Sequence, residues 1–246
     1  MDRIVFPSDI EEFSNGLNEV TSNRSWNSVD HGYNYIQYHL QRLSEAYQVK
    51  DVSFLVFDND KPIAAFLGFV SYEDIKLDFP SLLYLAPGAK SSKSLKKFIF
   101  SELDRSALTN GATLLYRDYL VDGCLSFLSR RLLLLGAKPQ TMINQTIDLT
   151  KSEQELKKDV RKSYKSLISS SFRDFEMVLY DSSNISWSVF QDVMKLHFSV
   201  VGSKTRSDSV WKHQFELIRN QNAFLILGFV NTEIVSAGYF GYNVTN

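Results

Sequence analysis

Two stretches of similar pattern decide the fold: residues 54–65, FLVFDNDKPIAA, and residues 226–237, ILGFVNTEIVSA. Each has an apolar segment, a polar turn centred on Asn59-Asp60 or Asn231-Thr232, and a second apolar segment with small residues. An apolar run, a short polar turn and another apolar run indicate a β-hairpin. Because identical residues recur at one constant offset, we expect the chain to contain two copies of one structural unit.

An amphipathic helix is predicted before each hairpin, because apolar residues recur there at helical spacing. These residues are Tyr35, Tyr38, Leu43 and Tyr47 in the first copy, and Trp211, Phe215 and Ile218 in the second. After the first hairpin, strands are predicted at residues 82–85, 113–116 and 141–143, and helices at residues 95–110 and 125–128. Gly111 is placed to end the first of these helices in a left-handed conformation. This alternation predicts an α/β fold with a mixed sheet, divided into domains at residues 1–149 and 150–246.

The composition limits the classes of function. A chain of 246 residues with 44% hydrophobic residues can bury a core, and its formal charge of -1 argues against general nucleic-acid binding. The single cysteine, Cys124, fits a reducing, cytoplasmic compartment, and its apolar neighbours predict a small core residue. The four histidines are scattered, so no metal site is expected, and no apolar run suggests a membrane span.

Residues 150–168 differ from the rest of the chain because they are basic and predicted to be helical. Thr150 and Glu153 have the spacing of a capping box, which predicts a helix start. Leu156, Val160, Tyr164 and Leu167 recur at helical spacing and are predicted to form a buried stripe, with lysine and arginine on the other faces.

These features together resemble the FemAB family of tandem GNAT-fold transferases. In that family the two copies are joined by a basic helix of the pattern Leu-x-x-x-x-Arg-Lys-x-x-Arg-x-x-Ile, which residues 156–168 follow, with Lys165 where an arginine is usual. Residues 147–150 and 197–206 are also similar to the family. The resemblance implies a GNAT-like acyl-CoA N-acyltransferase fold in tandem, with an incomplete second copy. No long helical hairpin is present, which favours an acyl-CoA thioester over aminoacyl-tRNA as the donor.

A GNAT-type site holds the pyrophosphate of its donor on backbone N–H groups at the start of a helix. The matching segment here is residues 86–94, whose candidate donor contacts are Gly88, Lys90, Ser91, Ser92 and Lys93. Gly88 permits close backbone approach, and the lysines and serines supply further donors. The superfamily's glycine pattern is not satisfied, so a solvated, serine-capped helix start is the alternative interpretation.

Candidate contacts for an anionic substrate lie on the basic helix and in the loop after Gly202. They are Arg161, Lys165, Lys204 and Arg206, and folding would have to bring Arg206 against Arg161 and Lys165 for them to share one cleft. The alternative is a solvated helix face. Tyr239 and Tyr242 could line an acceptor pocket or pack across strands.

Acylation of an amine by direct attack needs a base but no covalent enzyme intermediate. The candidate bases are His197 and Asp118; the alternatives are a histidine at the edge of the core and a carboxylate that caps the next helix. The leading hypothesis is an N-acyl or aminoacyl transferase acting on a cell-wall or surface-glycan precursor, a substrate class that the resemblance implies. The other two are an acetyl-CoA-dependent N-acetyltransferase for an amino sugar or small amine, and a non-catalytic GNAT-fold binding module.

Overall fold

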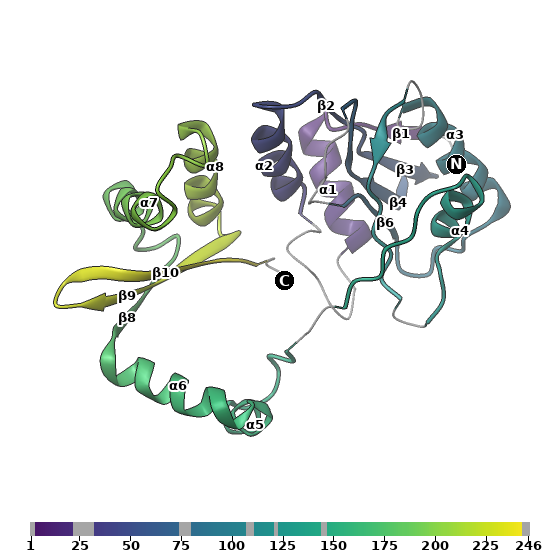
Figure 1. The fold of residues 1–246 in the computed structure, drawn as a ribbon. Helices are drawn as coiled ribbons and strands as arrows, with labels where there is room; N and C mark the ends of the chain where they lie inside the picture. The colour runs from purple at the N-terminus through teal and green to yellow at the C-terminus, as the bar shows by residue number, and fades with distance from the viewer. Residues whose placement is uncertain are drawn as a thin grey trace. The chain divides into compact units, whose positions relative to one another are not determined.

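The computed structural model describes residues 3–21, 32–73, 80–106, 111–120, 123–143 and 147–242 (Figure 1). Contacts divide this part of the chain into two compact units. Unit 1 holds the described residues up to Ala137, together with residues 206–214 and Tyr242, and unit 2 holds residues 138–205 and 215–241. The division between residues 149 and 150 stays a prediction.

Unit 1 is a layered α/β structure. Its elements are β1 (Arg3–Val5), α1 (Ile10–Thr21), α2 (Tyr33–Ser44), β2 (Val49–Asp51), β3 (Phe54–Asp58), β4 (Lys61–Leu67), β5 (Phe69–Ser71), β6 (Leu82–Leu85), α3 (Lys93–Ser106), β7 (Thr113–Leu114) and α4 (Phe127–Leu134). The strands form one sheet in the order β1-β3-β4-β6 and another in the order β2-β5-β7. All of these ladders are antiparallel, and an isolated parallel bridge joins Ser81 to Tyr116. The predicted mixed α/β class is confirmed.

The core of unit 1 lies on both faces of the first sheet, because apolar side chains of β3 alternate between them. Leu55 and Phe57 pack with Phe13 and Leu17 of α1 on one face. Residues Phe54, Val56, Ala64 and Phe66 pack on the other face with Leu95, Ile99 and Leu103 of α3 and Leu128 of α4. Helices therefore cover both faces of this sheet (Figure 1).

Unit 2 contains a smaller sheet and its own helices. The elements are α5 (Glu153–Asp159), α6 (Lys162–Asp174), β8 (Glu176–Tyr180), α7 (Trp187–Val201), β9 (Ala223–Val230) and β10 (Glu233–Gly241). The helix α8 (Asp208–Arg219) begins among the residues of unit 1 and ends among those of unit 2. The strands form an antiparallel sheet in the order β10-β9-β8.

The predicted repeat is confirmed by strand register. Leu55 faces Ala65 in the first hairpin and Leu227 faces Ala237 in the second, and both hairpins skip one residue, Ile63 or Val235, at the same place in the ladder. The turn residues Asn59, Asp60, Asn231 and Thr232 all have positive φ, between 49° and 72°, as hairpin turns of the type I′ class require. In each copy a further strand, β1 or β8, pairs with the other edge of the hairpin's first strand, and two helices lie between them in sequence.

Several local predictions are wrong. Residues 141–143 are not a strand, and Leu125 and Tyr47 lie outside helices and are exposed. Cys124 is exposed rather than in the core, because it lies in the irregular segment before α4. The helix expected at residues 95–110 is α3, which ends at Ser106, and the predicted end at residue 110 lies outside the described residues. Gly111 has the predicted positive φ, 74°.

The basic segment also differs from its prediction. The capping box is formed by Ser152 and Glu155 rather than by Thr150 and Glu153, and the helix breaks at Val160, whose backbone is extended. Two helices, α5 and α6, replace the one that was expected. The predicted buried stripe is not buried: Tyr164 is 55% exposed and Leu167 57% exposed.

Candidate functional site

The loop between β6 and α3 contains residues 86–94, the segment predicted to contact an acyl donor. The Ala86 N–H donates to the Ile63 carbonyl at 2.9 Å, and the Ala89 N–H donates to the Ala86 carbonyl at 3.0 Å, so the loop turns sharply as it leaves the sheet. Gly88 has a φ of 76° there, and a Cβ on it would meet no atom within 4 Å. The loop backbone is therefore open to a ligand on this side, in a conformation that favours glycine.

The side chains of this loop divide into two roles. The Ser92 hydroxyl accepts from the Leu95 N–H at 3.1 Å and so acts as the N-cap of α3. Lys90, Ser91 and Lys93 are exposed beside it. The capped helix start predicted as the alternative is thus present, and it is compatible with phosphate binding because the cap uses one N–H of the first turn.

Two strand segments separate next to this loop. Ser81 is hydrogen-bonded to two residues of the segment after β7. Its N–H donates to the Leu115 carbonyl at 2.6 Å, and its carbonyl accepts from the Arg117 N–H at 3.0 Å. Beyond Ser81, residues 82–85 pair with β4, whereas residues 117–120, all of them described, belong to no strand. The pairing between the two segments therefore stops at Ser81.

Asp118 lies in the segment that separates from β6, and it holds the start of α4. Its Oδ2 accepts from the Ser126 N–H and from the Ser129 hydroxyl, both at 2.7 Å. The Tyr116 hydroxyl lies 3.3 Å from the Ser126 hydroxyl. Burial raises the pKa of Tyr116, and the negative charge of Asp118 raises it further, whereas the hydrogen bond to Ser126 lowers it. The structure thus places Asp118 in the capping role predicted as its alternative.

The second candidate base, His197, lies on α7 in unit 2. Its Nε2 is 2.8 Å from the Thr205 hydroxyl, next to the exposed Lys204. The hydrogen bond ties the loop after Gly202, which ends α7 with a φ of 75°, back to the helix. His197 therefore belongs to unit 2, whereas Asp118 belongs to unit 1.

The candidate anion contacts fall into two groups. Arg161 and Lys165 are exposed at the start of α6, where the Lys165 ammonium donates to the Lys158 carbonyl at 3.2 Å. Arg206 is half-buried, and its guanidinium lies 4.8 Å from the ring centroid of Trp211, a cation–π contact within unit 1. A cleft shared by Arg161, Lys165 and Arg206 stays a prediction.

The two tyrosines considered for the acceptor are both half-buried. Tyr239 lies on β10 opposite Leu225 of β9, the cross-strand position given above as its alternative role. Tyr242 directly follows β10 and falls in unit 1, so a pocket lined by both tyrosines stays a prediction.

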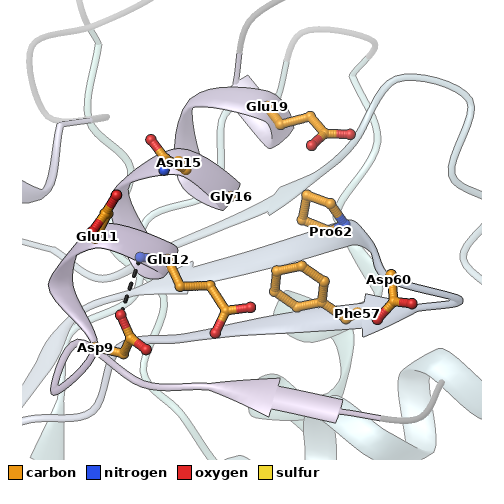
Figure 2. Close-up of a pocket in the computed structure, with 9 residues that line it drawn as sticks. All are labelled: Asp9, Glu11, Glu12, Asn15, Gly16, Glu19, Phe57, Asp60 and Pro62. Carbon is orange, nitrogen blue, oxygen red and sulfur yellow. Dashed lines mark hydrogen bonds between the residues drawn. The ribbon is translucent and has the colours of Figure 1, made fainter.

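An acidic cleft of about 470 Å³, not predicted from the sequence, lies between α1 and the first hairpin (Figure 2). Its lining contains the carboxylates of Asp9, Glu11, Glu12, Glu19 and Asp60, with Asn15, Gly16, Phe57 and Pro62. The guanidinium of Arg3 pairs with Glu12 and lies 4.4 Å from the ring centroid of Phe57, so a cation of the chain itself is bound at this edge. The signal in the sequence was the run of acidic residues at Asp9, Glu11, Glu12 and Glu19, a stretch for which no element was predicted.

Among the described residues, no three His, Cys, Asp or Glu side chains are grouped so that they could hold a metal ion. No helix in the described part of the chain is both long and apolar enough to cross a membrane.

Comparisons with known proteins give a likeness to solved structures and none to a protein family or a curated protein. No protein-family model matches the sequence, and no curated protein matches it. Among solved structures, the apo form of the aminoglycoside antibiotic 6'-N-acetyltransferase AAC(6')-IG from Acinetobacter haemolyticus is 15% identical, with a TM-score of 0.31; the match covers 59% of this chain and 98% of the other. Values this low establish neither a common substrate nor a common activity.

Proposed function

We propose that this chain is an N-acyltransferase that takes its acyl group from a coenzyme A thioester and transfers it to an amine. The observation that carries this proposal is the open loop at Gly88 between β6 and the capped start of α3. Unpaired N–H groups and the helix dipole favour an anion at that place, and Lys90 and Lys93 add positive charge. A pyrophosphate is the anion for which such a loop is suited.

Transfer of the acyl group by direct attack of the amine needs no covalent enzyme intermediate. The amine nitrogen attacks the thioester carbonyl, a C–N bond forms, the C–S bond breaks, and the thiolate leaves with a proton released by the amine. The residues must therefore orient the thioester, stabilise the oxyanion and accept a proton. Residues 82–85, where the strand pairing opens, have backbone groups to orient the donor, and Asp118 and His197 are the proposed bases.

The proposed acceptor is an amine on a cell-wall or surface-glycan precursor. The resemblance to the FemAB family supports this substrate class, and Arg161, Lys165, Lys204 and Arg206 would contact the phosphates of such a precursor. Tyr239 and Tyr242 would line the acceptor site.

Calorimetric titration with acetyl-CoA tests the donor site. We expect binding to the native chain, and we expect the charge reversals Lys90→Glu and Lys93→Glu together to weaken it by about tenfold or more, since each removes an attraction and adds a repulsion. Lys97→Glu is the matched control, because Lys97 is exposed on the same helix one turn further from the loop. Absence of acetyl-CoA binding to the native chain, or equal weakening by Lys97→Glu, contradicts the proposed site.

A titration with a nucleotide-sugar precursor tests the acceptor separately. Binding of the precursor without binding of acetyl-CoA would support a recognition module in place of a transferase. Binding of acetyl-CoA with acetylation only of small amines would keep the transferase and exclude the glycan acceptor.

A further inference from the structure

One face of the sheet in unit 2 carries exposed apolar side chains. On the inner face, Leu225 and Leu227 of β9 are buried. On the outer face, Met177 and Leu179 of β8 and Phe240 of β10 are 44%, 51% and 45% exposed. Exposed apolar side chains gathered on one face of a sheet mark an interaction surface rather than the scattered exposure of ordinary surfaces.

The internal repeat shows what kind of element covers this face. Phe54 and Val56 of β3 occupy the register positions of Ile226 and Gly228 of β9. In unit 1 those two residues pack with Leu95, Ile99 and Leu103 of α3. The fold therefore places an amphipathic helix of about four turns on the face that is open in unit 2.

The helix α6 has an apolar stripe with the same spacing as α3. Leu95, Phe98, Ile99 and Leu103 of α3 correspond in spacing to Tyr164, Leu167, Ile168 and Phe172 of α6. All four side chains of α6 are exposed, between 39% and 74%, and no residue of α6 is buried. An amphipathic helix with an exposed stripe needs a surface on which to bury it.

The connection between α6 and β8 keeps α6 from covering the sheet of its own chain. Only Phe175 lies between the end of α6 at Asp174 and the start of β8 at Glu176. A helix that folds back over the strand it leads into needs a longer connection than one residue. Figure 1 shows α6 running into the start of β8 rather than lying over this strand.

We propose that two copies of this chain form a two-fold dimer in which α6 of each copy covers the outer face of β8–β10 of the other. Such an arrangement is isologous, so each contact is made twice. Seven apolar side chains, between 39% and 74% exposed, offer on the order of 600 Å² of apolar surface per chain at the areas usual for such residues. A stable interface buries about 800 Å² per partner, which the flanking atoms of α6 and the strands would complete.

The mass of the protein in solution tests the dimer, independently of acyl transfer. Sedimentation equilibrium between roughly 1 and 100 μM should give twice the chain mass of 28.2 kDa. Leu167→Glu, which places a charge in the stripe, should give a monomer, and Ser166→Glu, on the opposite face of α6, should stay a dimer. Circular dichroism that matches the native chain shows that the variants are folded.

A charge-swap pair tests which surfaces meet. Leu179→Lys should also give a monomer, because Leu179 lies on the outer face of β8. Mixing Leu167→Glu with Leu179→Lys should restore a dimer, since one contact then regains an opposite charge pair and the other is native. A native chain that is monomeric throughout this range, or a dimer that survives both single variants, overturns the proposal.

Discussion

At the scale of the residue, variants of Asp118 can distinguish a structural role of this side chain from a catalytic one. Its Oδ2 accepts two hydrogen bonds of 2.7 Å at the start of α4. Asp118→Ala leaves the Ser126 N–H and the Ser129 hydroxyl without this acceptor, so we expect a loss of about 1.5–3 kcal/mol in the free energy of unfolding. Urea unfolding followed by circular dichroism measures it.

Asp118→Asn gives the matched control for the same residue. The amide keeps one oxygen acceptor but has no charge and cannot take a proton, so a capping role predicts a smaller loss of stability than in Asp118→Ala. Acetyl transfer that falls steeply in Asp118→Asn while stability is kept would assign the base to Asp118. Unchanged stability in Asp118→Ala would contradict the capping role.

The capping by Asp118 also shows where sequence reasoning reached its limit. The residue type at the end of a strand was enough to name two roles, a base or a helix cap. Which role applies depends on two hydrogen-bond donors, Ser126 and Ser129, which lie 8 and 11 residues further along the chain. The pattern of apolar and polar residues does not show that folding brings these donors to Asp118. The acidic cleft was missed for a similar reason, because Asp60 joins the α1 carboxylates only through folding.

At the scale of the element, Gly68 lies against Ser81, the residue that bridges the start of β6 to the segment after β7. A Cβ on Gly68 would lie 2.0 Å from the Ser81 hydroxyl oxygen, 2.3 Å from its Cβ and 3.0 Å from its Cα. Gly68→Ala should therefore cost about 1–3 kcal/mol of unfolding free energy, the usual range for overpacking. Thermal or urea unfolding measures the loss.

The double variant Gly68→Ala with Ser81→Gly shows whether the clash is the cause. Ser81→Gly removes the two nearest atoms, so the effects of the two changes should be non-additive, with the double variant more stable than the sum predicts. Additive losses would mean that Gly68 acts through something other than its contact with Ser81.

Elements were predicted well where local geometry decides them and poorly where tertiary packing does. The two hairpins could be found because the turn residues and both apolar segments of each lie within twelve positions of the sequence. The predicted burial of the apolar stripe on the basic helix was wrong, because helical spacing identifies a stripe but not the surface that covers it. Tyr164 and Leu167 belong to this stripe and are exposed. Its break at Val160 had no glycine or proline to signal it.

At the scale of the whole molecule, the two copies of one hairpin differ in how their sheets are covered. Both faces of the first sheet in unit 1 are packed under helices, whereas the outer face of the sheet in unit 2 carries exposed apolar side chains. Because burial of apolar surface is the main favourable term in folding, we expect unit 2 to open at lower denaturant than unit 1. Amide hydrogen exchange, compared at equivalent positions such as Leu55 and Leu227 or Ala65 and Ala237, measures the difference.

Dimer formation would hide this difference by covering the open face, so the comparison belongs in Leu167→Glu. In that variant, the amides of β9 and β10 should have a smaller opening free energy for hydrogen exchange than those of β3 and β4. The turn conformation and the strand register of the two hairpins are alike, so they do not account for this difference. The native chain at high concentration should then show added protection in β8–β10 but not in β3–β4, because binding stabilises only the surface that it covers. Equal protection of the two hairpins in the monomeric variant would show that the outer face of β8–β10 needs no cover, and that its exposed apolar residues have no role in holding this sheet together.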